Sequence, residues 1–428
     1  MIDAKRIVVA ATLLLPTILT CISGAQDIAI KGGRILTISR GMVEGGTVLV
    51  KGGKIEAVGD DVIIPSEVRV IDAKDKYVMP GLIDIQSRLF VIDRELNEDG
   101  RIVPELSILD AIDPYIKEYR EVLASGVTAV HAAPGSLGLI GGRSAVLKVN
   151  GGEILKPNVA VKAAIGVSNG SESSSLRRLE DYASIREALL AAKLYMQRKA
   201  KASRELVEYR KKKVEYDKLE EGKKDPKKKP KRPSRFRESP SQEVLAKVLS
   251  GQVPLLIEAH RTTDIMNALR LADEFGLSLI LGKCTEGYLV AEEIAKRKAP
   301  VIVGPVSTSF VDMPRLEYRR HNLRNAGILA GSGVKVALGV AGRDGASSKF
   351  VTLAAAMAVA NGMDESAALR AITLTPAEIL GVEDRIGSLE AGKDADVVIL
   401  SGPPLETRSS VEMVLIDGKV VYERKASQ

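Results

Sequence analysis

The chain has 428 residues, of which 45% are hydrophobic and 27% are charged; this balance excludes a disordered chain and predicts a globular protein of two or three domains. The formal net charge of +7 is a local property, because residues 198–237 hold 18 Lys/Arg against 7 Asp/Glu and leave the rest of the chain mildly acidic. This distribution excludes a nucleic-acid-binding surface spread over the whole protein, and we expect no specific nucleic-acid partner.

Residues 1–25 are predicted to form a secretory signal peptide. Two basic residues precede an apolar run from Ile7 to Leu19, and small residues follow up to an expected cleavage point after Ala25. The run is too short for a comfortable membrane span, and the alternative is an ordinary buried helix. We therefore expect an exported protein, periplasmic or extracellular, with no membrane span. No lipid anchor is expected, because Thr20 fits a lipoprotein site poorly.

The two ends of the chain carry β patterns. Residues 26–79 contain short alternating runs split by glycines, which predict antiparallel strands with tight turns. Residues 388–428 repeat this style, and Asp417-Gly418 is a strong signal for a two-residue hairpin. Segments at opposite ends of a chain can close into one small β-sandwich, which makes the middle of the chain an inserted domain.

Residues 80–387 alternate predicted strands with predicted helices, which favours an α/β fold with a parallel sheet. The segment contains seven or eight strand candidates, and Ala145–Val149 is the doubtful one. This number favours a (β/α)8 barrel of the TIM type over an open doubly wound sheet. The segment carries no glycine fingerprint for a dinucleotide and no phosphate-binding loop.

Residues 171–242 are predicted to be an insert within the barrel. The first part has helical spacing and mixed charge, and the second part is rich in Lys and Pro and predicts a flexible segment. Two interpretations stay open: a solvated helical excursion between two barrel strands, or a docking arm for an anionic partner.

Several segments resemble the amidohydrolase superfamily, especially its imidazolonepropionase-like branch. They include "YVMPGLIDIQSRLF", "HAAPGSLGLIGGRSAVLKV" and "TLTPAEILGVEDRIGSLEAGKDADVVIL". The last is the most specific, because so many fixed positions seldom recur by chance. The resemblance covers nearly all of the chain from about Asp27 to Glu423. It implies a (β/α)8 barrel with a small β-sandwich, and a hydrolase of non-peptide carbon–nitrogen bonds that uses one or two divalent metals such as zinc to activate water.

The resemblance also implies metal ligands at specific strand positions, and this sequence departs from nearly all of them. A pair of His residues on the first strand, a His on the fifth, a His on the sixth and an Asp on the eighth are replaced. The vestigial metal-site positions are Gln86, Arg88, Glu258, Lys283 and Ala341. Only Lys162 is unchanged, at a position where some members carboxylate a lysine to bridge two metals.

These replacements predict a site without a metal or other cofactor. Arg88 has no lone pair to offer a cation, a charged Lys283 repels one, and Ala341 removes the carboxylate that would act as general base. Isolated buried charges are costly, so we expect Glu258 to pair with Arg88 or Lys283, and Gln86 to bond into the same cluster.

The sequence therefore favours an exported, amidohydrolase-like pseudoenzyme that binds a small molecule, or that forms homo- or hetero-oligomers with an active relative. A first alternative is a working hydrolase with an atypical site, for which zinc would be the metal. Its candidate catalytic groups are Lys162, Glu258, His260 and His131. Both histidines follow predicted barrel strands, and a purely structural role for each stays open. A second alternative is a scaffold whose basic insert binds an anionic partner.

Overall fold

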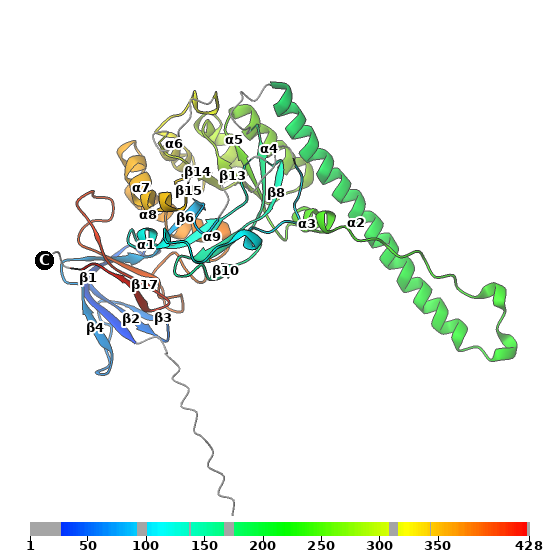
Figure 1. Ribbon diagram of the computed structural model, residues 1–428, viewed down its shortest axis with the longest axis horizontal. Coiled ribbons are helices and arrows are strands. Elements are labelled where there is room, and N and C mark those ends of the chain that lie inside the picture. The colour runs from blue at the N-terminus through cyan, green and yellow to red at the C-terminus, as the bar shows by residue number, and fades with distance from the viewer. Residues whose placement is uncertain are drawn as a thin grey trace, which may run out of the picture.

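The computed structural model describes residues 27–91, 101–136, 138–166, 175–307, 316–342 and 344–425, without the side chains of Ser175, Lys223 and Leu316. The expected signal peptide lies outside the described residues. Figure 1 shows three parts: a central α/β body, a small β domain beside it, and a long helical arm that projects from the body. No helix in the described ranges is long and apolar enough to cross a membrane.

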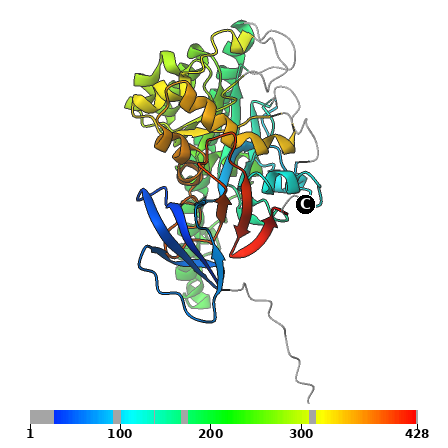
Figure 2. The same ribbon diagram turned by 90° about the vertical axis from the view of Figure 1, so that its left-hand side faces the viewer.

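The small domain is one eight-stranded sheet built from both ends of the chain. Its order is β18-β17-β16-β5-β1-β2-β3, and β4 pairs with β1. The bounds are β1 (Ile28–Leu36), β2 (Met42–Lys51), β3 (Lys54–Gly59), β4 (Arg69–Asp72), β5 (Tyr77–Pro80), β16 (Val397–Leu400), β17 (Val411–Ile416) and β18 (Lys419–Glu423). Strand β5 pairs with β1 and with β16, so the blue and red strands lie side by side (Figure 2).

Local sequence signals explain this sheet. Alternating positions such as Ile28, Ile30, Val48 and Val50 are almost fully buried and pack into one apolar cluster. Residues Asp417 and Gly418 join β17 to β18 with φ angles of 50° and 71°. A two-residue hairpin with two left-handed residues is the geometry that Asp-Gly favours, so the predicted turn is confirmed.

The body contains two arcs of strands, ordered β10-β9-β7-β6 and β15-β14-β13-β12-β11-β8. Strands β6 and β7 pair in parallel, as do the successive strands from β11 to β15. The bounds are β6 (Leu82–Ser87), β7 (Val127–Ala132), β8 (Ile140–Arg143), β9 (Ala145–Lys148), β10 (Ile154–Lys156), β11 (Val161–Ile165), β12 (Leu255–Ala259), β13 (Leu279–Lys283), β14 (Val301–Val303) and β15 (Val336–Leu338).

The two arcs meet at both edges. On one side β9 pairs with β7 and β8 pairs with β11, so one continuous stretch of chain belongs to both arcs. On the other side the Val340 amide, just after β15, donates to Asp84 Oδ1 of β6 at 3.4 Å. The strands are therefore arranged as in a (β/α)8-type fold, but the hydrogen-bonded sheet is divided in two and does not close into one ring. The doubtful strand exists as β9, but it runs antiparallel, because the short link from β7 has no room for a crossover helix.

Helices cover the outside of the arcs. They are α1 (Tyr119–Leu123), α3 (Pro240–Leu249), α4 (Thr262–Phe275), α5 (Ala291–Lys296), α6 (Asn325–Gly331), α7 (Val351–Ala360) and α8 (Glu365–Ala371). Helix α9 (Leu374–Leu380) instead contributes Ala377 and Leu380 to the apolar cluster inside the arcs. Helix α4 is representative: Ile265, Ala268 and Leu269 bury one face, and Gly276 ends the helix in the left-handed conformation. Inside the arcs, Ile83, Leu256 and other apolar side chains form a separate cluster that fills the lumen.

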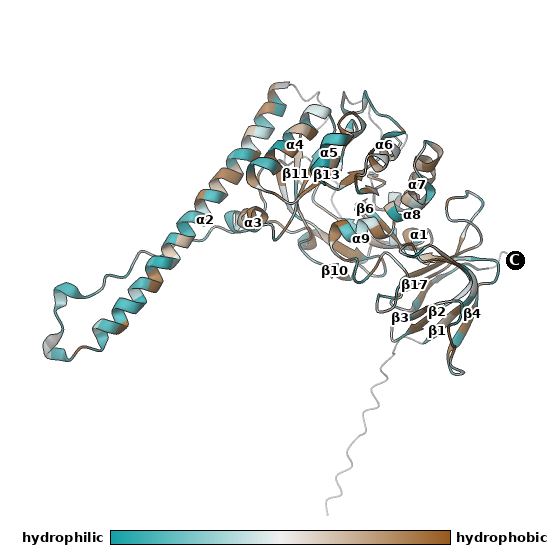
Figure 3. Ribbon diagram, turned by 180° about the vertical axis from the view of Figure 1, so that it is seen from behind, coloured by the Kyte–Doolittle hydropathy of each residue, from teal (hydrophilic) through white to brown (hydrophobic). Residues whose placement is uncertain are grey.

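The predicted insert is a hairpin-like arm. Helix α2 (Ser175–Asp217) is 43 residues long, and the chain then returns beside it to α3. Near the body, Ile185, Leu189 and Ala192 are fully buried, whereas the outer length is largely exposed and hydrophilic (Figure 3). The returning segment packs Phe236 against Tyr195, with ring centroids 5.2 Å apart. The helical spacing of the first part is thus confirmed, and the flexibility of the second part stays a prediction.

Candidate functional site

A pocket of about 80 Å³ opens at the mouth of the barrel, toward the carboxyl ends of the strands. Parallel strands place their carboxyl ends at one edge, and active sites of this fold lie there. Seven of the eight residues singled out in the sequence line the pocket: Gln86, Arg88, His131, Lys162, Glu258, Lys283 and Ala341. The structure therefore brings together the positions at which the resemblance implies metal ligands, and of the eight residues it leaves only His260 outside.

Strand β12 carries Glu258 into this pocket. Leu256 lies in the lumen cluster, and Glu258, two residues further on, projects from the same side of the strand. The neighbouring residue Gly282 on β13 leaves room for it, because a Cβ there would lie 2.9 Å from Glu258 Cγ. The carboxylate is 4% exposed, so it needs an internal counter-charge.

Lys162 of β11 supplies that counter-charge. Its Nζ lies 3.3 Å from Glu258 Oε1, and it also donates to the carbonyl oxygen of Pro134 at 2.6 Å and to Ser136 Oγ at 3.2 Å. Burial favours the neutral acid, but the charges of Lys162 and Lys283 outweigh it and lower the pKa of Glu258 to about 2. Burial lowers the pKa of Lys162, and Glu258 opposes this shift.

This ion pair corrects the expected one. Within the described residues, Glu258 pairs with Lys162, whereas Lys283 acts on it only through its charge. Gln86 does not bond through its side-chain oxygen to any described group. Its side chain instead fills space left by Gly304 and Gly339, where a Cβ would lie 2.4 Å and 3.0 Å from Gln86 Oε1. Lys162 is the partner because its strand, β11, pairs directly with β12 and places Nζ 3.3 Å from the carboxylate.

His131 of β7 is a neutral hydrogen-bond acceptor toward the pocket. Its Nδ1 lies 2.9 Å from the carbonyl oxygen of Ile85, which can only accept, so Nδ1 carries the proton and Nε2 is left with its lone pair. Burial lowers the pKa of His131 to about 4, so the ring is uncharged at neutral pH. No described group bonds to Nε2.

Lys283 and Ala341 share an unusual backbone conformation. Their φ angles are 67° and 52°, in the left-handed region that residues with a side chain seldom adopt. Burial lowers the pKa of Lys283, although Glu258 opposes this shift. Across the described chain, the Lys283 ammonium makes no hydrogen bond or ion pair, and every other interaction found for it is the field of Glu258, Arg88 and Asp84.

His260 has a structural position. Its Nδ1 lies 2.7 Å from Thr285 Oγ1, and its ring meets the Tyr318 ring edge-on at 5.0 Å between centroids. The ring is 5% exposed and does not line the pocket. These contacts hold His260 beside the loop after β13 and outside the pocket. Its position therefore does not support the expected catalytic role.

Two contributors were missed in the sequence. The loop after β7 supplies Pro134 and Ser136 to Lys162, and Asp84 organises the end of β6. Asp84 accepts from the amide of Gln86 at 3.0 Å and from the Ser348 hydroxyl at 2.6 Å. Burial raises the pKa of Asp84, and the Ser348 bond opposes this shift. An acid inside an apolar strand was the available signal for Asp84.

The groups that line the pocket do not fit the divalent metal that the resemblance implies. Lys162, Lys283 and Arg88 bring positive charge to the place where a cation would lie, and Ala341 brings no donor atom. Glu258 already neutralises Lys162. Among the residues that the structure describes, no three His, Cys, Asp or Glu side chains gather as a metal site.

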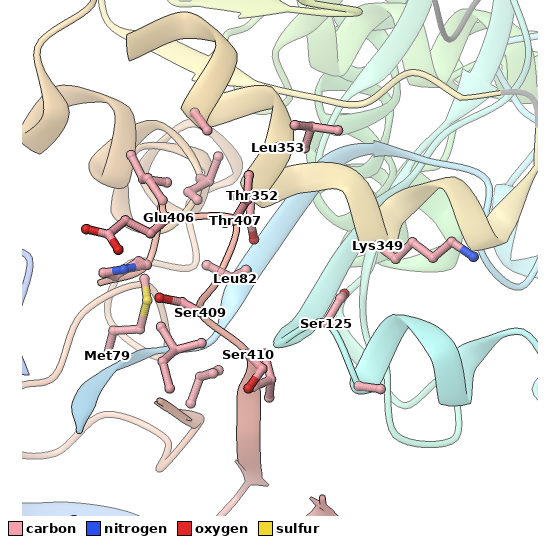
Figure 4. A pocket seen from close by; sticks show the side chains of 18 of the residues that line it. Met79, Leu82, Ser125, Lys349, Thr352, Leu353, Glu406, Thr407, Ser409 and Ser410 are labelled. Carbon is pink, nitrogen blue, oxygen red and sulfur yellow. The ribbon is translucent and has the colours of Figure 1, made fainter. Parts of the chain in front are cut away.

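A larger cavity of about 370 Å³ lies elsewhere, between the body and the small domain. Figure 4 shows Met79, Leu82 and Leu353 among its apolar lining, with Glu406 at one side and Lys349 directed away. Lys349 is already paired with Glu121 at 2.7 Å. The barrel mouth is the stronger candidate, because buried polar atoms without partners converge there.

Comparisons with known proteins agree with this fold. The amidohydrolase family model matches residues 284–421. A solved amidohydrolase from Thermotoga maritima MSB8 is 30% identical, with a TM-score of 0.78, and the match covers 93% of this chain and 100% of that chain. The structure of molinate hydrolase is 18% identical, with a TM-score of 0.56 over 95% and 99% of the two chains, and this likeness shows the fold alone.

Curated relatives match over shorter stretches. Imidazolonepropionase from Desulfotalea psychrophila is 30% identical over 151 residues, which are 35% of this chain and 34% of that protein. Dihydroorotase from Anaeromyxobacter dehalogenans is 31% identical over 105 residues, which are 24% and 21%. The chain thus matches only 34% and 21% of the length of these two relatives, whereas it matches the whole Thermotoga protein at 30% identity. The chain therefore belongs to the amidohydrolase family.

Proposed function

We propose that this protein is a pseudoenzyme of the amidohydrolase family, in which an internal ion pair occupies the place of the catalytic metal. The observation that carries the proposal is the buried contact of 3.3 Å between Lys162 and Glu258 in the pocket at the barrel mouth. A carboxylate held by a lysine is not available to a metal, and a lysine held by a carboxylate is not available for carboxylation. The protein binds a small molecule, or serves as a subunit beside an active relative.

A hydrolysis assay tests this proposal. The purified chain is incubated with a panel of amides and cyclic amides, with and without added zinc, and the release of amine is followed. The expected result is no turnover above that of the Glu258→Gln variant, because no carboxylate stands at Ala341 to take a proton from water. Turnover that the wild type shows and this variant lacks would contradict the proposal.

A working hydrolase with an atypical site is the second candidate. The observation in its favour is the unpartnered Nε2 of His131, which lies in the same pocket as Glu258. A neutral imidazole can take a proton from water as a general base. This candidate predicts that turnover is lost in the His131→Ala variant and kept in His260→Ala, since His260 lies outside the pocket.

A scaffold that presents the basic arm is the third candidate. Helix α2 and the segment after it reach away from the body (Figure 1). Most of the lysines between residues 211 and 231 are exposed. Such a surface would attract an anionic partner, and the attraction would fall as salt rises. Binding of heparin by the whole chain, weakened by salt and lost on deleting residues 198–237, would support it; equal binding without these residues would exclude it.

Export also stays a proposal, supported by the basic, apolar and small-residue segments of the first 25 residues. Amino-terminal sequencing of the protein recovered from the medium or periplasm tests it. The expected mature chain begins at Gln26, and a chain that keeps its first residues in the cytoplasm would contradict export.

A further inference from the structure

Three buried polar atoms at the barrel mouth lack partners in the described part of the chain. Glu258 uses one carboxylate oxygen for Lys162, and its Oε2 bonds to nothing. His131 Nε2 and Gln86 Oε1 are also buried and have no hydrogen-bond partner among the described residues. Buried polar atoms in native proteins are nearly always satisfied, so a group of exceptions in one pocket points to a missing ligand or water. Glu258 and His131 are 4% and 2% exposed and both line the pocket.

A positive group without a partner lies beside these acceptors. Lys283 lines the pocket and makes no hydrogen bond or ion pair within the described residues. Its backbone, with φ at 67°, and that of Ala341, with φ at 52°, are strained. Strained residues cluster at ligand sites, because the surrounding structure must hold them against a local cost. The pocket thus offers Lys283 as an anchor for negative charge, and it offers acceptor atoms for hydrogen-bond donors.

The atoms available decide which ligand class fits. A simple anion would satisfy Lys283 and leave the acceptors unpaired, whereas a simple cation would bind Glu258 and lie against Lys283. A molecule that carries a carboxylate and an adjacent ammonium or amide N–H satisfies both sets. The pocket volume is about 80 Å³, and one water molecule needs roughly 10–15 Å³ in the same measure, so the pocket has room for a small molecule of several heavy atoms.

We infer that the barrel mouth binds a small zwitterion of the α-amino-acid class. The carboxylate contacts Lys283, and the ammonium group donates to Glu258 Oε2 and to His131 Nε2. The bound carboxylate supplies the counter-charge that Lys283 lacks inside the protein. This inference rests on the proposed function, because a metal held by Glu258 would leave no acceptor for the ammonium group.

Calorimetric titration of the full chain with glycine tests the inference, with acetate and methylammonium as probes that each carry half of the pattern. A chelator is present throughout, so that no metal can bridge glycine to the protein. Saturable binding of glycine is expected, with acetate and methylammonium each about tenfold weaker or more. No saturable glycine binding, or acetate binding as tightly as glycine, would overturn the inference.

Two variants locate the site. Lys283→Gln should weaken glycine binding by about tenfold or more. The control is Lys298→Gln, which changes another lysine with positive φ, exposed and outside the pocket, and should bind glycine like the wild type. Equal affinities in the two variants would overturn the assignment. The titration needs neither metal nor turnover, so absence of glycine binding would not contradict the pseudoenzyme proposal. Hydrolysis in the assay above would contradict that proposal and would not determine whether glycine binds.

Discussion

Glu258 and Lys162 show how strongly a single buried pair can determine the character of a site. Each is more than nine-tenths buried, and each is the nearest opposite charge to the other that the structure records. Burying a lone charge costs far more than burying a pair, so the two residues depend on one another. This dependence keeps both side chains in place and makes them poor ligands for a metal ion.

Removing one partner should therefore be expensive. Glu258→Ala leaves Lys162 buried without a counter-charge and should lower the free energy of unfolding by about 3–5 kcal/mol. Chemical denaturation followed by circular dichroism measures this. The control is Glu293→Ala, which breaks a partly exposed pair with Arg297 at 2.5 Å and should change stability little. Equal losses of unfolding free energy in the two variants would show that the buried pair stabilises the fold no more than the partly exposed pair does.

The buried pair should also make the stability of the protein depend on pH. The pKa of Glu258 is lowered from 4.5 to about 2 in the folded protein, so its contribution is fully present above pH 4.5 and is lost as the pH falls toward 2. A shift of this size corresponds to about 3 kcal/mol. Denaturation curves between pH 5 and pH 2 should fall less steeply in Glu258→Gln than in the wild type. Parallel curves would contradict the assignment.

Among the structural elements, the arm is tied to the body by a buried charge network at its base. Arg178, on the first turns of α2, bonds to Asp264 of α4 and lies 2.7 Å from Glu317. Burial raises the pKa of Asp264 to about 6, and Arg178 opposes this shift. The network explains how a helix of 43 residues, exposed over most of its length, keeps a fixed start.

Arg178→Ala should loosen this attachment, because it leaves two buried carboxylates facing each other. Hydrogen exchange should become faster in the first turns of α2 and in α4, and the unfolding free energy should fall by about 3 kcal/mol or more. The control is Arg186→Ala on the same helix, which removes an exposed pair with Glu274. It should leave exchange in α4 unchanged, and faster exchange there in both variants would contradict the argument.

At the scale of the whole molecule, Lys148 joins the barrel to the small domain. Its Nζ lies 3.0 Å from Asp394, 2.8 Å from Asp396 and 2.8 Å from Asp417. The lysine comes from β9 of the barrel, whereas the three acids come from the carboxyl-terminal part of the chain. Burial opposes its charge, but these carboxylates outweigh burial and raise the pKa of Lys148.

Lys148→Met should destabilise the junction between the barrel and the small domain. Three carboxylates would be left close together, and the thermal midpoint should fall by several degrees or the single transition should split in two. Differential scanning calorimetry measures both. Lys156→Met is the control, because within the described ranges Lys156 bonds only to the backbone carbonyls of Leu380 and Gly381. A larger effect in this control than in Lys148→Met would contradict the junction role.

The sequence was a good guide to the fold and to the residues at the barrel mouth, for identifiable reasons. Alternation and the Asp417-Gly418 turn are local signals, and they predicted the two-ended sheet. Strand ends of a barrel converge, so Gln86, Lys162 and Glu258 could be placed together before their contacts were known. Which charge pairs with which depends on distances between strands, and no local pattern encodes these. The same holds for His260, whose bond to Thr285 is decided by a loop.

The metal content of the purified protein tests the central claim most directly. The full chain is incubated with zinc, manganese and iron salts, passed through a desalting column, and analysed for metals. We predict well below one metal ion per chain in the wild type. The Lys162→Met variant should be less stable and should also hold well below one metal ion per chain. One tightly bound zinc per chain, lost on Glu258→Gln and kept in the partly exposed control Glu293→Gln, would contradict the claim that an internal ion pair has replaced the metal.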